Sequence, residues 1–240
     1  NEYAAICGIT EEEMLTQMSD DIDALAQAQG IGREEAISKL KDNYDGYHFS
    51  AKSPDMFNPY SLLNCFADNE FNDYWFSSGT PTYLLNMMRK YEVMPTDVIT
   101  RVEADASEFD APTENMTTIM PLLYQSGYIT IKDYNRAYNY YTLDVPNKEV
   151  KVGLTKALIP SYVTRNTLAT TNTARRIAQA LDKRDMDGAL RLLQTFLGTI
   201  PYCENTNYEG HYQQLLFVVF SLLTDFLVDV EVHTPNGRVD

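Results

Sequence analysis

The chain has 240 residues, which is enough for two or three small domains with cores of their own. A formal net charge of -15 at pH 7 disfavours non-specific binding to nucleic acid, because phosphate contacts require clustered Lys and Arg. No apolar run approaches the roughly 20 residues that cross a bilayer, and three scattered cysteines fit neither a disulfide framework nor a zinc site. We therefore expect a cytoplasmic protein with no membrane segment.

The first 45 residues favour three helices. Thr10 is a hydroxyl cap before EEEMLTQM, and Glu13 occupies the capping-box position. A second helix is expected in DDIDALAQAQG, which Gly30 ends, and a third in REEAISKLKDNY, where apolar residues recur at helical spacing. This pattern predicts a small helical module.

The next segment, YDGYHFS, carries a turn signal. Asp45-Gly46 between aromatic residues predicts a tight hairpin turn with positive φ at the glycine. Two helices are then expected, one beginning near Pro59 and one with Thr80 as its cap and Pro81 in its first turn. We interpret the aromatic residues around both helices as core anchors rather than ligand cages.

From Met116 the pattern is that of a winged helix. MTTIMPLLYQSG predicts a helix that Gly127 closes, YITIKDY and YYTLDVPN predict a two-stranded wing, and NKEVKVGLTKALIPSYV predicts a helix with Asn147 as its cap. Lys132 and Arg136 are the candidate phosphate contacts of the wing, but few other basic residues accompany them. A packing role is therefore favoured over a DNA-reading role.

The last third of the chain begins with a polar stretch, residues 164–173, which predicts a linker or a domain edge. ARRIAQALDKRD and MDGALRLLQTFLGTI then predict an antiparallel pair of short helices. The apolar run LLFVVFSLL indicates a buried helix, and FLVDVEVHT followed by PNG indicates a strand and a turn into a second strand that ends at Asp240.

A search for catalytic motifs excludes two kinds of site within this chain. No G-x-x-x-x-G-K-[ST] sequence occurs, so no nucleotide-binding loop is predicted. The three histidines, His48, His211 and His233, have no nucleophile signature beside them, and we interpret each as structural or solvated.

Two acids near the end of the chain are candidate metal ligands. Glu209 begins the apolar helix, and Asp240 lies on the strand that pairs back across the Asn236-Gly237 turn. Because that helix is expected to pack on the sheet, the two carboxylates can converge, and carboxylate oxygens are the ligands that Mg²⁺ prefers. The alternative is that Glu209 caps the helix and Asp240 is a surface residue.

Several segments resemble, in the same order, the AAA-ATPase-like proteins common in Bacteroides-type bacteria. Those proteins join an N-terminal ATPase-like module to a C-terminal PD-(D/E)XK nuclease-like domain. The segments are NYDGYHF, MFNPYSLLNCF, YWFSSGTPTYLLNMM, LLYQSGYITIKDY, LDVPNKEV, EGHYQQLLFVVFSLL and VDVEVHTPNGRVD. The resemblance covers nearly the whole chain.

The resemblance implies a predominantly helical α+β chain in four parts. Residues 1–100 would be the helical end of the ATPase-like module, 101–165 a winged-helix-like unit, 166–203 a helical connector and 204–240 the start of a restriction-endonuclease-like α/β fold. The phosphate-binding loop for ATP would lie upstream of this chain, and the acid-x-Lys pair of the nuclease motif would lie downstream.

The same resemblance assigns roles to the two acids. Glu209 matches the helix acid of the nuclease motif and Asp240 matches its first Asp, so both would be catalytic and would bind Mg²⁺. The parent protein would act on nucleic acid, whereas this acidic chain would neither cleave DNA nor hydrolyse ATP by itself. The alternative is a non-catalytic module that binds partner proteins or serves regulation.

Overall fold

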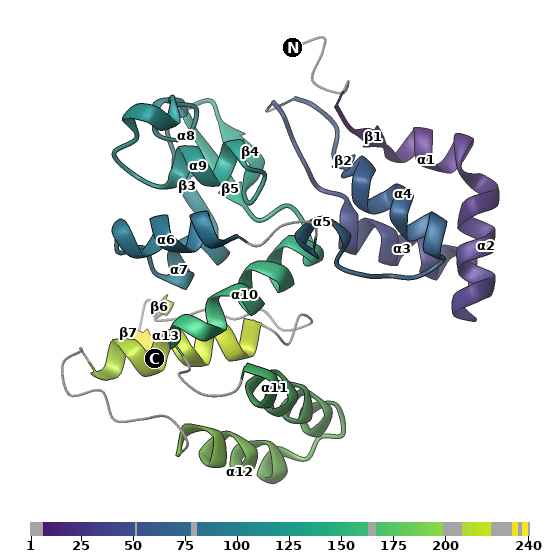
Figure 1. The fold of residues 1–240 in the computed structure, drawn as a ribbon. Helices are drawn as coiled ribbons and strands as arrows, with labels where there is room; N and C mark the ends of the chain where they lie inside the picture. The colour runs from purple at the N-terminus through teal and green to yellow at the C-terminus, as the bar shows by residue number, and fades with distance from the viewer. Residues whose placement is uncertain are drawn as a thin grey trace. The chain divides into compact units, whose positions relative to one another are not determined.

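The computed structural model describes residues 7–50, 52–77, 81–162, 167–198, 208–221, 232–234 and 237–239 (Figure 1). It confirms a predominantly helical α+β chain, and the sheets in the described residues are small and antiparallel. The chain divides into unit 1, Asn1–Val93 with Asp97–Gly153, and unit 2, Met94–Thr96 with Leu154–Asp240. The four-part division predicted from the sequence is finer and stays a prediction.

Unit 1 begins with four helices whose ends follow local sequence rules. They are α1 (Glu11–Gln17), α2 (Ser19–Gln29), α3 (Arg33–Tyr44) and α4 (Pro59–Asp68). The Thr10 side chain accepts from the Glu13 amide at 3.2 Å, and the Glu13 carboxylate accepts from the Thr10 amide at 2.9 Å, which confirms the capping box. Gly30 ends α2 with φ 67°, as expected.

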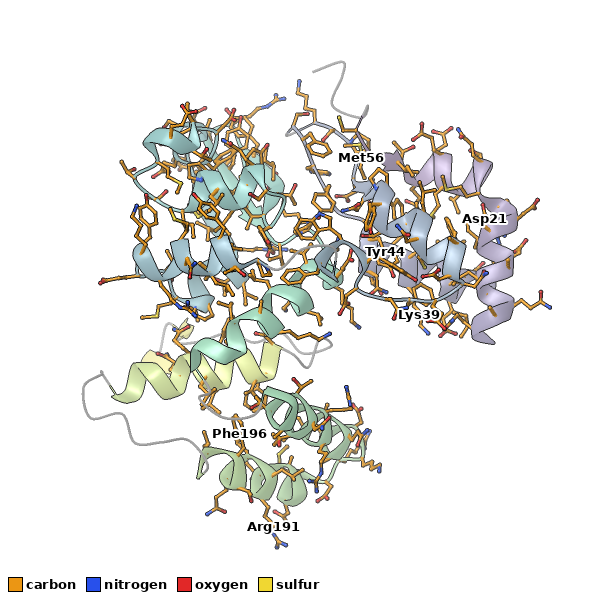
Figure 2. All side chains as sticks on the ribbon, in the orientation of Figure 1. Asp21, Lys39, Tyr44, Met56, Arg191 and Phe196 are labelled. Atoms are coloured by element: carbon orange, nitrogen blue, oxygen red, sulfur yellow. The ribbon has the colours of Figure 1, made fainter. Side chains whose placement is uncertain are left out.

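One apolar core holds these helices together with a two-stranded sheet, β1 (Ile9–Thr10) paired to β2 (Met56–Phe57). Tyr44 is fully buried in this core, whereas Lys39 lies on the outer side of the same helix and pairs with Glu35 (Figure 2). Helical periodicity therefore places the core side of α3 correctly. The larger buried members are Met14, Ile22, Leu25, Leu40, Tyr44, Phe57, Leu62 and Phe66.

The predicted hairpin at Asp45-Gly46 is wrong, although Gly46 does have positive φ, at 97°. Tyr44 is the last residue of α3, so no strand precedes the turn. Beyond it, Tyr47 forms an isolated antiparallel bridge with Met56. Tyr44, the aromatic residue before the turn, lies on the buried side of α3. An aromatic residue directly before Asp-Gly is also typical of a strand that enters a hairpin, which explains the wrong prediction.

Three short helices follow α4. They are α5 (Tyr74–Ser77), α6 (Thr82–Lys90) and α7 (Pro95–Ile99). Pro81 is the N-cap of α6 rather than its first helical residue, and the predicted cap Thr80 lies outside the described residues.

The two strands predicted for the wing are confirmed as an antiparallel hairpin, β4 (Thr130–Asn135) and β5 (Tyr140–Asp144), and the winged-helix interpretation stays a prediction. A strand that the sequence did not predict, β3 (Val102–Ala104), pairs with β5, so the sheet order is β3-β5-β4. Between β3 and β4 lie α8 (Ala106–Phe109), the 3-10 turn η1 (Thr113–Asn115) and α9 (Met120–Gln125). The pairing of β4 with β5 shifts register between Ile131 and Asp133, which puts Lys132 at a bulge.

Helix α10 (Lys148–Tyr162) begins in unit 1 and continues into unit 2. Its predicted cap is confirmed, because the Asn147 side chain accepts from the Val150 amide at 3.1 Å.

Unit 2 continues with three helices, α11 (Thr167–Asp182), α12 (Met186–Leu197) and α13 (Tyr208–Ser221). The predicted linker is wrong from Thr167 onward, because α11 begins there and buries Thr170 and Ala174 despite its polar start. On α12, Phe196 is buried against α11 and α13, and Arg191 extends to the opposite, exposed side (Figure 2). Among the described residues, no helix is long and apolar enough to cross a membrane.

The chain ends in a confirmed backbone hairpin. β6 (Val232–Thr234) pairs antiparallel with β7 (Gly237–Val239), with Val232 opposite Val239. The predicted turn residue Asn236 lies outside the described residues.

Candidate functional site

The predicted metal ligands lie at the end of the chain. Glu209 is in the first turn of α13, but side chains before residue 213 in this helix are outside the described part of the structure. Asp240 follows β7 and is also outside it. The described side chains contain no group of three or more His, Cys, Asp or Glu that could hold a metal ion. The assignment of Glu209 and Asp240 to Mg²⁺ therefore stays a prediction.

The best-defined polar site is in unit 1, where the turn after α3 meets the sheet and the start of α10. The Lys132 ammonium donates to the Gly46 carbonyl at 2.7 Å and to the Pro146 carbonyl at 3.0 Å. Burial lowers the pKa of Lys132, partly offset by nearby acids that include Asp55. A lysine considered as a phosphate contact is thus engaged with two backbone carbonyls, while Arg136 is exposed and stays a candidate.

Gly46 is required at this turn for space as well as for its positive φ. A Cβ atom there would collide with the Pro146 carbonyl and with the Lys132 ammonium. On the other side of the turn, the Asn147 amide group donates to the Asp45 carbonyl at 3.1 Å. Residues more than 80 positions apart in the sequence thus close one turn through backbone carbonyls.

Asp45 itself is buried, and its Oδ1 has no hydrogen-bond partner within the described structure. Burial raises the pKa of its carboxyl group, while the Gly46 amide acts in the opposite direction. The burial of this carboxyl group directly beside the turn therefore opposes folding.

A second buried carboxylate, Glu149, lies one residue into α10. It accepts from the Ser61 hydroxyl at 2.7 Å and from the Trp75 amide at 2.6 Å. Burial raises the pKa of Glu149, although these hydrogen bonds lower it. One turn later, a Cβ at Gly153 would collide with the Phe76 ring. The first turns of α10 therefore contact α4 and α5 in two ways. The Glu149 carboxylate binds a side chain of α4 and the backbone of α5, and Gly153 leaves room for the Phe76 ring of α5.

His48, in the segment after the turn, is hydrogen-bonded to β4. The Thr130 hydroxyl accepts from the His48 amide at 2.8 Å and donates to the His48 carbonyl at 3.0 Å. The His48 Nε2 lies 3.0 Å from the Asp55 carboxylate. For this histidine, the structural interpretation made from the sequence agrees with its contacts.

Next to these contacts lies a cavity of about 380 Å³ within unit 1. The residues around it come from the segment before β1, the turn after α3, the end of β2 with the start of α4, α5, the end of α9, the loop that follows α9 and the start of β4. They are Cys7, Tyr47, His48, Phe49, Phe57, Asn58, Pro59, Trp75, Tyr124, Gln125, Ser126, Gly127, Ile129 and Thr130. A partly apolar hollow of this size is typical of small-molecule sites.

Several segments that line this cavity were predicted from the sequence, but their meeting around a cavity was not. Of the aromatic residues around the two helices, Phe57 is buried, as expected of a core anchor, but Tyr60 is 51% exposed and Tyr83 is 64% exposed, so the interpretation is wrong for these two. Phe57 lines the cavity together with the buried Tyr47 and with Phe49, which is 46% exposed.

The buried contacts of Glu149 and Lys132 were not predicted, because their partners are distant in sequence, and Lys132 was considered only as a phosphate contact. An acid next to a helix cap reads as a capping acid, and a lysine in a strand reads as a surface charge.

Comparisons with known proteins add a relative but no activity. No family model matches the chain, and no solved structure matches it. It is similar to an uncharacterized protein in the vnfD 5' region of Azotobacter chroococcum mcd 1, with 30% identity over 247 residues. The match includes 99% of this chain and 45% of the relative, so the chain spans less than half of the relative's length.

Proposed function

We propose that this chain is the middle part of a longer protein that joins an ATPase-like module to a metal-dependent PD-(D/E)XK nuclease-like domain acting on nucleic acid. The observation that carries the proposal is the hairpin β6–β7 following the apolar helix α13, which agrees with the helix, strand, turn and strand order of the resembling family. The relative's greater length is compatible with further domains on either side.

The winged-helix-like part of the proposal is supported by topology. The sheet order β3-β5-β4, with α8 and α9 between the first two strands in sequence, is the arrangement expected of a winged helix. Helix α9, the one before the wing, carries no Lys or Arg. We therefore assign this unit a packing role within the protein.

In the proposed nuclease-like site, Glu209 and Asp240 contribute carboxylate oxygens, which suit Mg²⁺. The bound ion supplies charge stabilisation at a phosphodiester. The remaining acid and the lysine of the motif would come from sequence beyond residue 240. ATP would bind only to the upstream module, and this chain by itself would be inactive.

The test is cleavage of DNA by a longer chain that includes the complete domain. Asp240→Asn should abolish Mg²⁺-dependent cleavage, a loss of about a hundredfold or more, because one metal ligand loses its charge. Asp182→Asn, which changes an exposed acid at the end of α11, is the matched control and should cleave like the parent sequence. Equal cleavage by both variants would remove Asp240 from the site.

A second candidate is a non-catalytic module that binds partner proteins. The engagement of Lys132 by two carbonyls favours it, because the wing is left with Arg136 as its exposed cation in a chain of net charge -15. Binding of this chain to DNA at low salt distinguishes the two roles of the wing. Loss of binding in Arg136→Ala would restore the DNA-contacting role, and no binding at all supports the module.

A further inference from the structure

The residues that line the cavity beside Tyr47 are suited to one class of ligand. We propose that it binds an uncharged, planar aromatic or heteroaromatic ring. The inference does not depend on the nuclease-like proposal, because the cavity lies in unit 1 and uses neither Glu209 nor Asp240.

Five aromatic side chains supply the apolar wall: Tyr47, Phe49, Phe57, Trp75 and Tyr124. Neighbouring rings hold two of them in place. The Trp75 ring meets Tyr128 edge to face at a centroid distance of 5.3 Å, and the Tyr124 ring meets Phe109 in the same way at 4.8 Å. Rings that are already held by a neighbouring ring lose little entropy when a planar ligand packs against them from the cavity.

Gly127 leaves the wall open where two of these rings approach the backbone. A Cβ there would lie 3.6 Å from Tyr47 Cε1 and 3.9 Å from Trp75 Cζ2. Any side chain at this position would project toward the same space. The glycine, with φ 76°, thus ends α9 and also keeps the cavity free.

The uncharged character of the described lining residues disfavours charged ligands. The chain contains 34 acidic and 19 basic residues, yet among the residues that the structure describes no Asp, Glu, Lys or Arg lines the cavity. The one titratable nitrogen base there, His48, has its Nε2 3.0 Å from Asp55. A carboxylate or an ammonium would lose hydration in the cavity and find no counterion, which opposes its binding.

Three polar side chains of the wall already make hydrogen bonds within the protein. Thr130 exchanges two hydrogen bonds with the His48 backbone, Gln125 donates to the Ala111 carbonyl at 2.7 Å, and Asn58 accepts from the Tyr60 amide at 3.0 Å. These groups do not need a ligand to satisfy them. Ring packing and shape therefore dominate the selection.

The position of Trp75 gives a direct test, because it is the single tryptophan of the chain and it lines the cavity. Benzamide, benzoate and benzamidine are nearly isosteric and differ in charge. Benzamide should change the Trp75 fluorescence in a saturable manner, in the millimolar range expected of a fragment of about ten heavy atoms. Benzoate and benzamidine should bind at least about tenfold more weakly.

Two variants locate the binding. Phe49→Ala removes a half-exposed ring and should weaken benzamide about threefold or more. Ser126→Leu adds volume to the wall and should abolish saturation. Tyr138→Ala is the matched control, because this ring is 79% exposed on the hairpin between β4 and β5 and does not line the cavity. Circular dichroism of each variant verifies the fold.

The proposal is overturned by any of three results. One is quenching by all three compounds that stays linear with concentration, which indicates collisions rather than a site. Another is tighter binding of either charged compound than of benzamide. The third is unchanged benzamide binding in folded Phe49→Ala and Ser126→Leu, which would place the ring elsewhere.

Discussion

Two regions of unit 1 are stabilised in different ways. The helices α1 to α4 combine an apolar core with local caps, such as the reciprocal bonds between Thr10 and Glu13 three residues apart. The junction of the turn after α3 with β4 and α10 instead depends on buried polar groups. There, Lys132 contacts a carbonyl 86 positions away, and Glu149 contacts a hydroxyl 88 positions away.

The two regions differ in whether a substitution leaves a backbone group that water can reach or one that is buried. A lost cap in the first region exposes an amide that water can reach, which costs about 1 kcal/mol. A lost partner in the junction leaves a buried carbonyl or amide without a hydrogen bond, which costs about 1–3 kcal/mol for each group. The junction is therefore the more sensitive region, and its substitutions should show larger effects than chemically identical ones among the helices.

The largest expected contrast is between two glycines with positive φ. Gly46→Ala should lower the free energy of unfolding by roughly 3 kcal/mol or more, because left-handed strain adds to a collision with the Pro146 carbonyl. Gly30→Ala has nothing within 4 Å of its Cβ and should cost about 1 kcal/mol from strain alone. Urea unfolding followed by Trp75 fluorescence, which reports unit 1, measures both, and equal costs would contradict the collision.

The next contrast is between two lysines. Lys132→Met keeps the length of the side chain but leaves the Gly46 and Pro146 carbonyls without their donor, and it should cost about 2 kcal/mol. Lys39→Met removes an exposed pair with Glu35 and should change stability by less than about 0.5 kcal/mol. The same unfolding experiment compares them. A neutral Lys132→Met would mean that the two carbonyls find water.

The smallest contrast is in the pH dependence of stability. Burial raises the pKa of Glu149 above 4.5, so between 4.5 and the raised value the folded protein binds more protons than the unfolded chain. This group's contribution to stability is therefore lost as the pH rises through that window. Backbone hydrogen bonding by Thr10 lowers the pKa of Glu13, so its contribution is present above 4.5 and lost as the pH falls.

Removing each group should therefore tilt the stability curve in opposite directions. Relative to the parent chain, Glu149→Gln should make stability rise more steeply with pH, and Glu13→Gln should make it rise less steeply. Urea midpoints from about pH 3 to about pH 8 give both slopes, because the Glu13 window lies below 4.5 and the Glu149 window lies above it. A slope that a substitution leaves unchanged would show that the carboxyl group titrates in the folded protein as it does in water, and slopes that change in the same direction would show that one of the two pKa shifts has the opposite sign.

Prediction from sequence succeeded where the signal and its cause lie within one turn or one strand. The start of α1 at Thr10, the end of α2 at Gly30 and the hairpin β4–β5 followed from caps and alternation. It failed at Asp45-Gly46 and in the stretch from Thr167, where aromatic or polar composition imitated a strand or a linker. In both places the buried side of a helix decided the outcome.

The candidate sites divide in the same way. The sequence pointed to Glu209 and Asp240 through a family pattern, and their metal-binding role stays a prediction. It gave no indication of the Lys132 and Glu149 contacts or of the cavity at Tyr47. These depend on residues from several elements meeting in space, which no local pattern encodes.

By itself, the sequence determined the helical character of the chain, the caps at Thr10, Gly30 and Asn147, the hairpins β4–β5 and β6–β7, and the apolar sides that form the cores. Only the tertiary structure decided that Gly46 is required for space, that Lys132 is engaged with carbonyls and that Trp75 borders a cavity. The physical reason is that propensity and periodicity act over a few residues. The pairing of buried polar groups joins segments 74 to 102 positions apart, and the shape of the cavity likewise depends on segments distant in sequence.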